Sequence, residues 1–435
     1  MTLPNADPWE NLEPEIQDEL AGSEGPDLSS HKSLSSPWPS IDPDAFYGLP
    51  GDTVNGIDAH TEADRVSTLM HVLVAFGNVV GDGPYALVQN DKHPARLYAA
   101  ATGDTGVGRK GLSWGAPRDL ITTADHFWAS RRIRSGLSSG EGLIYHVRDG
   151  GEKDEGEPDK RLLIVEPEFS SMLKIMAREG NSLSGALRQA WDSGNLSTLT
   201  RNNPLIATGA HISVIGHTTK EELLRNLDCT ERANGFGNRI LWFLVKRSKL
   251  LPDGSEIPPE IMNLLADRIG AAIHFGQEAG RIFRDREASN LWREIYPVLS
   301  EGRPGLSGAL CNRAEAQTLR LSLTYALLDC SPMIRVEHLR AALAVWDYCE
   351  NSVRYIFGDR TGNPVADRIL DELKLKSEGL TGEEIRDLFS RHKTAEKDQA
   401  IEMLLRLRRI YTEQISTKGR PVTVFRLATK ATKAT

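Results

Sequence analysis

A short glycine-rich segment has residue types that suit the binding of a polyphosphate. It runs Gly103-Asp-Thr-Gly-Val-Gly-Arg-Lys-Gly-Leu-Ser113 and directly follows an apolar stretch that is typical of a buried strand. Glycine backbone can wrap around phosphates, a lysine can reach their terminal oxygens, and a hydroxyl can bind Mg²⁺. The segment predicts a P-loop for ATP and Mg²⁺. The expected nucleotide contacts are Gly103, Thr105, Gly106, Gly108, Arg109, Lys110, Gly111 and Ser113.

The loop departs from the usual P-loop spacing, in which the lysine directly follows the last glycine of GxxxxG. Arg109 stands before Lys110, and Gly111 occupies the position of the metal-binding Ser or Thr. We therefore expect Ser113 to be the displaced Mg²⁺ ligand. Pro117 lies where the helix after the loop would reach its second turn, so this helix is expected to be kinked or to start late. A glycine-rich surface loop is the alternative.

Two carboxylates, Glu166 and Glu168, follow the apolar segment 161–165. In P-loop ATPases an acid at the end of a strand holds the Mg²⁺ shell, and a nearby glutamate orients and deprotonates the attacking water. Glu166 suits the metal role and Glu168 the role of the base, although the pattern leaves open which of the two activates water. The alternative is a solvated strand end, since acids are common at such positions.

A histidine and an arginine flank two later apolar segments. His217 follows one of them, at the end where ligands of an open α/β sheet bind, and is predicted to sense the γ-phosphate. The adjacent Thr218 or Thr219 would equally well cap the next helix, with Glu221 or Glu222 completing a capping box.

Arg239 precedes the other segment. An arginine at the mouth of a sheet can neutralise a phosphate of its own site or of a neighbouring subunit, so Arg239 is a candidate arginine finger. Structural pairing with a nearby Glu is the rival interpretation.

The elements that position these residues follow from hydrophobic periodicity. Between 45 and 250, apolar runs alternate with helical patterns, which predicts an α/β core with a mostly parallel sheet. Residues 1–44 are rich in Pro, Ser, Asp and Glu and are expected to be a disordered acidic leader, and the charged insertion 149–160 to be solvated and mobile. Segment 251–360 has helical stripes only, which indicates a helical lid or bundle.

The C-terminal part predicts a winged helix. Residues 364–428 contain three short amphipathic segments, then IYTEQIS, the turn KGRP and VTVFRL, and 429–435 read as a disordered tail. Residues 364–435 carry fifteen Lys or Arg against eleven acids, whereas residues 1–50 carry ten acids and one lysine. The basic end therefore predicts DNA binding, with dimerisation or protein docking as the alternative. The candidate phosphate contacts are Lys393, Lys397, Arg406, Arg408, Arg409, Lys418 and Arg420.

Longer strings carry a resemblance to a known family. They are FYGLPGD, HTEAD, GDTGVGRKGLSW, SGLSSGEGLI, DKRLLIVEPEFSSMLKIMAREGNSLSGALRQAWDSG, ATGAHISVIGHTTKEEL and NGFGNRILW. Over residues 45–250 the chain resembles the helicase-like, RecA-type P-loop ATPases found beside or fused to primases in phages, plasmids and integrative elements. The resemblance implies a RecA-like core and an ATPase activity. Its typical loop, GxTxxxRKGxS, implies that Arg109 and Ser113 are regular family features. It also draws attention to 135–144 as a second nucleotide contact, a DNA-facing loop or a plain connection.

Composition excludes some classes of protein. The chain has 435 residues, a formal net charge of -8 and 40% hydrophobic residues, and no apolar run approaches the roughly 20 residues of a membrane helix. The acidic N-terminus lacks the features of a signal peptide. Four cysteines form no CxxC pair, which argues against a zinc knuckle or a disulfide framework. We expect a soluble, cytoplasmic protein without membrane contact.

These observations favour an ATP-dependent DNA helicase or translocase of mobile-element replication. It would act as a homo-oligomeric ring on single- or double-stranded DNA, with a separate primase or other replication proteins as possible partners. The first alternative is an ATP-dependent replication initiator or regulator that binds DNA without unwinding it. The second is a defence or scaffold protein whose ATPase fold no longer hydrolyses ATP.

Overall fold

We describe a computed structural model of the chain. It describes residues 38–104, 111–151, 154–198, 204–227, 234–303, 305–358, 360–361, 363–389, 394–416 and 421–428. Within these ranges, no helix is both long enough and apolar enough to cross a membrane.

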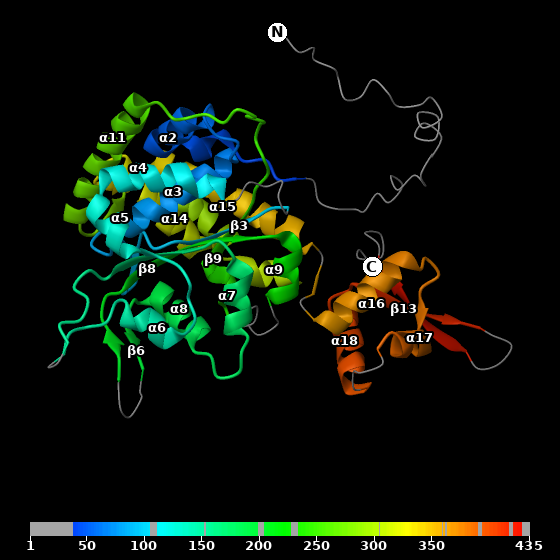
Figure 1. Ribbon diagram of the computed structural model, residues 1–435. Helices are drawn as coiled ribbons and strands as arrows, with labels where there is room; N and C mark the ends of the chain where they lie inside the picture. The colour runs from blue at the N-terminus through cyan, green and yellow to red at the C-terminus, as the bar shows by residue number, and fades with distance from the viewer. Residues whose placement is uncertain are drawn as a thin grey trace, which may run out of the picture. The chain divides into compact units, whose positions relative to one another are not determined.

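A five-stranded, fully parallel sheet forms the centre of the main part (Figure 1). Its order is β4 (Ile133–Arg134), β5 (Arg161–Glu166), β8 (His211–Thr218), β3 (Tyr98–Thr102) and β9 (Ile240–Leu244). The three middle strands and β9 are almost entirely buried, as expected for parallel strands covered on both faces, and β8 buries polar residues such as His211 and His217. The predicted α/β class with a mostly parallel sheet is confirmed, and the sheet is compatible with a Rossmann-like or RecA-like core.

Helices cover one face of the sheet and pack against side chains such as Ala99, Val165 and Phe243. Figure 1 shows this layer above the sheet. Its helices are α2 (Gly48–Asp58), α3 (Arg65–Val80), α4 (Gly115–Ala124), α11 (Pro259–Glu278), α14 (Ala314–Leu328) and α15 (Val336–Phe357). The short helices α5 (His126–Arg132) and α12 (Arg286–Leu299) and the 3₁₀ turns η2 (Pro43–Phe46) and η3 (Leu112–Trp114) adjoin it.

The opposite face carries a second apolar cluster built on Tyr98, Ile164 and Trp242. Its helices are α6 (Gly140–Tyr145), α7 (Phe169–Met176), α8 (Leu183–Asp192) and α13 (Gly305–Cys311), with α9 (Lys220–Asn226) beside α7. Successive residues of a strand point their side chains to alternate faces, so β3 contributes to both clusters. Small two-stranded pairs lie outside the sheet: β1 (Tyr85–Val88) with β2 (Asp91–Pro94), β6 (Leu196–Ser197) with β7 (Ile206–Ala207), and β10 (Phe283–Arg284) with β11 (Met333–Ile334).

The helices after residue 250 are not a separate lid. α14 and α15 belong to the same apolar cluster as α3 and β3. Tyr348 of α15 donates its hydroxyl to the Leu244 carbonyl at 2.8 Å, and the Leu244 N–H donates to the Ser352 hydroxyl at 3.2 Å. Thirteen of the fifteen residues of α14 are buried, and the buried Arg320 donates to the carbonyls of Arg96 at 3.0 Å and Trp191 at 2.9 Å. This helix completes the layer above the sheet.

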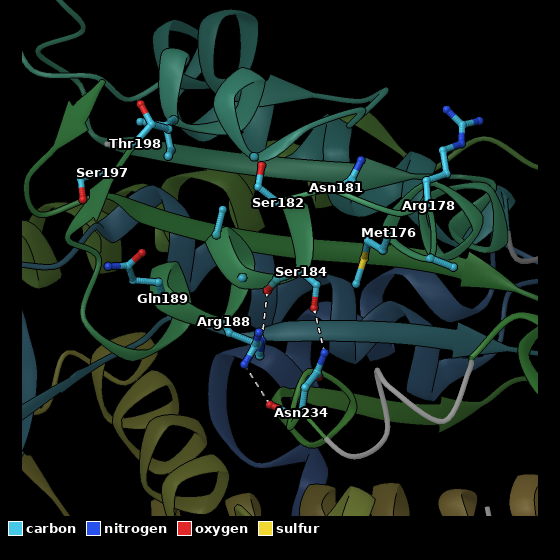
Figure 2. Close-up of a pocket in the computed structure, with 15 residues that line it drawn as sticks. Met176, Arg178, Asn181, Ser182, Ser184, Arg188, Gln189, Ser197, Thr198 and Asn234 are labelled. Atoms are coloured by element: carbon cyan, nitrogen blue, oxygen red, sulfur yellow. Dashed lines mark hydrogen bonds between the residues drawn. The ribbon is translucent and has the colours of Figure 1, made fainter. Parts of the chain in front are cut away.

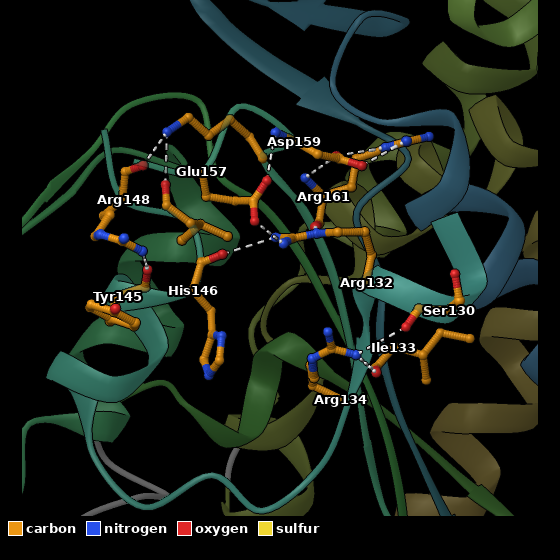
Figure 3. A network of polar contacts seen from close by, with 12 residues as sticks. Ser130, Arg132, Ile133, Arg134, Tyr145, His146, Arg148, Glu157, Asp159 and Arg161 are labelled. Carbon is orange, nitrogen blue, oxygen red and sulfur yellow. Dashed lines mark hydrogen bonds and ion pairs between the residues drawn. The ribbon is translucent and has the colours of Figure 1, made fainter. Parts of the chain in front are cut away.

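Two expectations of mobility are corrected within the described residues. Trp38 packs edge-on against Tyr355 with ring centroids 5.2 Å apart, so the folded part begins before residue 45. The insertion 149–160 is tied down by ion pairs (Figure 3): Arg132 Nη1 lies 2.9 Å from Glu157 Oε2, and Arg161 Nη2 lies 2.8 Å from Asp159 Oδ2. Its charges pair with residues at the amino ends of β4 and β5, which composition alone does not reveal.

The C-terminal part has its own small core, formed by residues such as Ile369, Leu380 and Leu404. Its elements are α16 (Pro364–Leu375), β12 (Leu380–Thr381), α17 (Gly382–Asp387), α18 (Thr394–Arg406), β13 (Ile410–Ile415) and β14 (Val422–Leu427). The three strands form an antiparallel sheet in the order β12, β14, β13. The three helices and the terminal hairpin occur where the sequence predicted them.

Candidate nucleotide site at the carboxyl edge of the sheet

The sheet brings three of the predicted motifs to one edge. β5, β8 and β3 are neighbours, and their register pairs Glu166 with Gly216 and Thr102 with Thr218. Gly103 N–H donates to the Thr218 carbonyl at 3.3 Å, so the glycine loop starts beside the end of β8. A Cβ on Gly103 would lie 2.6 Å from the Val245 carbonyl oxygen, which leaves room only for glycine. The loop residues Thr105, Gly106, Gly108, Arg109 and Lys110 lie outside the described residues, and their nucleotide contacts stay predictions.

Ser113, the predicted metal ligand, is buried against α3. Its side chain is 2% exposed, and the Ser67 hydroxyl donates to its Oγ at 2.8 Å. Gly111, just before it, is exposed. The helix after the loop starts late: α4 begins at Gly115 and places Pro117 in its first turn, where a missing N–H breaks no helical hydrogen bond. This confirms the second of the two possibilities expected for Pro117.

A pair of buried histidines joins the end of the loop to β8. His71 Nδ1 lies 3.1 Å from the Ser113 carbonyl oxygen, and His71 Nε2 lies 3.1 Å from His217 Nε2. A carbonyl only accepts, so Nδ1 of His71 carries the hydrogen, and Nε2 of the neutral ring accepts one from His217. Burial, with His217 beside it, lowers the pKa of His71 to about 3, which keeps this ring neutral.

His71 is not among the residues that the sequence motifs predict. A signal was present, because His71 lies among the apolar residues of the helical pattern 61–80, at a position that a polar side chain occupies only with a partner. That partner is 146 residues away in the sequence, and periodicity cannot supply it.

Glu166 and Glu168 have different surroundings. Glu166 is 8% exposed, and its Oε1 accepts the N–H groups of Gly136 at 2.7 Å and of Leu137 at 2.9 Å. Gly136 has φ +85°, a conformation that favours glycine, so the carboxylate holds a specific loop after β4. Glu168 is exposed at the start of α7 and makes no capping hydrogen bond. It is the carboxylate of the pair that solvent or a bound ligand can reach.

Ser113 and Glu166 do not fit a Mg²⁺ ion as they are arranged. Mg²⁺ needs oxygen ligands in near-octahedral geometry and keeps several waters, which requires an accessible position. The Ser113 hydroxyl faces α3 and receives a hydrogen bond, and one oxygen of Glu166 already accepts two N–H groups. Within the described residues there is also no cluster of three or more His, Cys, Asp or Glu suited to a metal. We therefore assign no metal step to these two side chains.

The hydroxyls after His217 have structural partners. Thr219 caps α9 and forms a reciprocal capping box with Glu222, as the structural alternative predicted. Thr218 Oγ1 lies 2.9 Å from Ser170 Oγ on α7. These contacts fix the turn that follows β8, and so they position His217 at the edge of the sheet.

Arg239 is on the opposite edge of the sheet from the glycine loop, which corrects its predicted place beside the nucleotide. β3 and β9 are parallel, with Tyr98 opposite Ile240, so Arg239 lies at the amino end of β9. Its guanidinium contacts Asp192 through two bonds, Nη2–Oδ2 at 2.6 Å and Nε–Oδ1 at 3.2 Å, and also donates to the Gly235 carbonyl. These are the contacts of a structural ion pair, with an aspartate in place of the expected glutamate.

The basic residues predicted to contact DNA phosphates in the C-terminal part differ in how exposed they are. Lys397 is buried, and its Nζ donates to the carbonyls of Arg386 at 3.0 Å and Phe389 at 2.8 Å, so it is not free to bind phosphate. It shares the inner face of α18 with Ala400 and Leu404. Arg406 and Arg408 are exposed and Arg409 is half-buried, whereas Lys393, Lys418 and Arg420 lie outside the described residues.

Comparison with known proteins adds no family to this geometry. No model of a known protein family matches the chain, and no curated protein sequence is significantly similar to it.

Proposed function

We propose that this protein binds and hydrolyses ATP at the carboxyl edge of β3, β5 and β8 and uses the energy to act on DNA as a helicase or translocase. One observation carries the proposal. Gly103 follows β3, Glu168 follows β5 and His217 lies near the end of β8, so all three are at the carboxyl ends of adjacent parallel strands. Ligands of open α/β sheets bind at this edge. The sequence resemblance to helicase-like RecA-type ATPases supports the same activity.

In this mechanism the glycine-loop amides and Lys110 hold the phosphates of ATP. A water attacks the γ-phosphorus while the bond to the β-phosphate oxygen breaks, and Glu168 takes the proton that the water loses. His217 donates its Nε2 hydrogen to His71, so its ring is held in one orientation at the end of β8. The histidine pair thereby links that strand to the segment that follows the glycine loop.

Lys110→Ala tests the nucleotide site directly. We expect ATP binding, followed by fluorescence of a nucleotide analogue, to be lost, because the lysine neutralises phosphate charge. Arg118→Ala is the matched control, since Arg118 is exposed on α4 and pairs with Asp119 at 2.8 Å. Wild-type ATP affinity in a folded Lys110→Ala protein would exclude the site. Turnover that rises with single-stranded DNA supports the motor.

We further propose that residues 364–427 form a winged-helix module that binds DNA. The order helix, strand, helix, helix and hairpin, with β14 between β12 and β13, supports this assignment. The exposed Arg406 and Arg408 supply positive charge at the end of α18. A docking or dimerisation module of the same fold would bind no duplex DNA, so removal of residues 364–435 would leave duplex affinity unchanged.

An ATP-dependent initiator that binds DNA without unwinding it is the second candidate. Ser113 and Glu166 already accept hydrogen bonds within the protein, so few groups are left for catalysis at this edge, and this favours the initiator. DNA binding that requires ATP without measurable turnover would support the initiator over the motor. A homo-oligomeric ring belongs to the motor proposal and is tested by sedimentation of the full chain with ATP and single-stranded DNA.

A further inference from the structure

A solvent-accessible pocket of about 540 Å³ lies on the outer side of α8 (Figure 2). We call it the α8 pocket. Its walls are formed by residues 184–189 of α8, the end of α7 with the connection that follows it, α6, residues 197–198 and Asn234. Arg178, Gly185 and Gln189 are among its lining residues, and all three are exposed. The volume is in the range of small-ligand sites.

The pocket is positively charged. Its fifteen lining residues include Arg178 and Arg188 but no Asp or Glu, and the nearby Glu141 carboxylate accepts a hydrogen bond from the Ser182 hydroxyl of the lining at 3.2 Å and forms no ion pair with either arginine. Arg188 donates to two backbone carbonyls, that of Asn234 at 3.1 Å and that of Ser184 at 3.4 Å, and has no carboxylate partner among the described residues. Arg178 has no side-chain hydrogen bond or ion pair within the same part of the chain. Neither charge is neutralised there, so an anion would be attracted to this pocket.

The other polar groups narrow the chemistry of the ligand. The lining also contains the hydroxyl and amide side chains of Asn181, Ser182, Ser184, Gln189, Ser197, Thr198 and Asn234. Of these, Ser182 is hydrogen-bonded to Glu141, and Asn234 donates to Ser184 at 3.3 Å. Such groups, together with arginine, form the usual set of contacts to phosphate oxygens in nucleic-acid complexes. The lining contains no aromatic ring, so the pocket offers no platform for stacking a base. The pocket suits the phosphate backbone of single-stranded DNA better than its bases.

We propose that the α8 pocket binds the phosphate backbone of single-stranded DNA and couples this binding to β5. Gly140 lines the pocket and begins α6, and a Cβ at Gly140 would lie 2.6 Å from Ser182 Oγ, so the two walls are in direct contact. The loop just before Gly140 donates the N–H groups of Gly136 and Leu137 to Glu166. DNA bound in the pocket would therefore contact the wall that this loop leads into, and the loop in turn holds Glu166 at the end of β5.

The coupling rests on the proposed ATPase function, but the binding site does not. Gly185 offers a substitution of matched size: it lines the pocket, and a Cβ there would meet no atom within 4 Å. Gly185→Asp places a carboxylate in the pocket, whereas Gly185→Asn places a neutral side chain of the same shape. Both replace a glycine within α8, so neither is expected to destabilise the helix.

The test measures the affinity of the full chain for a fluorescein-labelled oligothymidylate by anisotropy over a range of salt concentrations. Gly185→Asp is expected to weaken binding about ten-fold or more and to reduce the salt slope by roughly 0.7 for each phosphate that the pocket no longer neutralises. Gly185→Asn should bind like the wild type. Arg178→Gln should also weaken binding, whereas Arg340→Gln, which removes an exposed arginine from α15, should not.

Competition separates the possible sources of phosphate. ATP and inorganic phosphate are titrated against each variant, and the proposal requires the ATP affinity to be unchanged by Gly185→Asp. A loss of ATP or phosphate binding with unchanged oligothymidylate binding would overturn the proposal in favour of a free nucleotide. Equal binding of all three ligands by Gly185→Asp and Gly185→Asn would also overturn it. If Lys110→Ala retained ATP affinity while Gly185→Asp failed to bind DNA, the ATP site would be wrong and the pocket would stand.

Discussion

The two carboxylates at the end of β5 have different surroundings, although only Pro167 separates them. Glu168 is exposed, and as the proposed base it should be needed for the chemical step alone. We expect Glu168→Gln to lower ATP turnover by about 10²–10⁴-fold while ATP still binds, because general base catalysis contributes on this scale. Phosphate release and nucleotide binding, measured on the same preparation, check this. Turnover at the wild-type rate would remove Glu168 from the mechanism.

Glu166 provides the matched comparison. Glu166→Gln keeps an oxygen that can accept the N–H groups of Gly136 and Leu137, so a small effect on stability is expected. Glu166→Ala leaves both groups without an acceptor and should lower the free energy of unfolding by about 1–3 kcal/mol. Urea denaturation of the two variants measures the difference. Equal stability of Gln and Ala would show that these hydrogen bonds contribute little.

Buried histidines give the protein a predictable sensitivity to acid. Burial lowers the pKa of His71 to about 3, and burial with nearby Arg96 lowers the pKa of His211 well below its ordinary value. The unfolded chain therefore binds more protons than the folded chain below pH 6.5, and stability falls as the pH falls. Between pH 7 and pH 5 the buried His71 alone should cost about 2 kcal/mol of stability.

The variant His71→Asn isolates one of these contributions. Its amide can still donate to the Ser113 carbonyl but cannot take up a proton, so the loss of stability between pH 7 and pH 5 should be about 2 kcal/mol smaller than in the wild type. Urea denaturation at the two pH values measures the loss. His126→Asn, at an exposed position on α5, should behave like the wild type. An identical pH dependence in the His71 variant would contradict the assignment of a neutral buried ring.

Among the elements, β8 and α7 are in unusually close contact. A Cβ on Gly216 would lie 2.3 Å from Cδ2 of Phe169, the buried first residue of α7. We expect Gly216→Ala to lower the free energy of unfolding by about 1–3 kcal/mol and to reduce ATP turnover, because the clash displaces the start of α7 and with it Glu168. Calorimetry and turnover assays check both effects.

Gly270→Ala is the control for this substitution. Gly270 lies within α11, and a Cβ there meets nothing within 4 Å, so alanine should raise stability by up to about 1 kcal/mol. If Gly216→Ala were as stable and active as Gly270→Ala, the packing of β8 against Phe169 would have to be looser than described.

Lys397 is buried and Arg406 is exposed on α18, so opposite effects on stability and on DNA binding are expected when they are replaced. Lys397→Gln should destabilise the C-terminal part, since its Nζ holds two carbonyls, yet it should leave the salt dependence of duplex binding unchanged. Arg406→Gln should do the reverse and reduce the salt slope by about 0.9, the value for one phosphate contact. Filter binding at several salt concentrations measures this slope. A fall in slope caused by Lys397→Gln alone would return Lys397 to the DNA interface.

Local sequence patterns predicted most helices and strands, but they predicted the relative placement of these elements less well. The buried strands were found because each is a short apolar run, and the late start of α4 followed from Pro117. The place of Arg239 could have been deduced, because in a parallel sheet a residue that precedes a strand lies at the amino edge. The charge of Lys397 suggested a phosphate contact. Its spacing from Ala400 and Leu404, however, places it on the inner face of α18.

At the scale of the whole molecule, the missing information is long-range pairing. Asp192 is 47 residues from Arg239, and His71 is 146 residues from His217. The sequence shows that each of these side chains needs a partner when buried, but the fold decides which one it meets. The same holds for the ion pairs of the insertion 149–160, whose charges alone predicted a solvated segment.

The single apolar layer made by α3, α14 and α15 limits how this protein can be inherited or divided. A gene fragment encoding only residues 45–250 would carry every proposed catalytic residue, but its product would expose the apolar surface that α14 and α15 cover. Recombination between relatives should therefore exchange residues 38–358 as one block. The small separate core of the C-terminal part makes that part the piece most readily gained, lost or replaced during evolution.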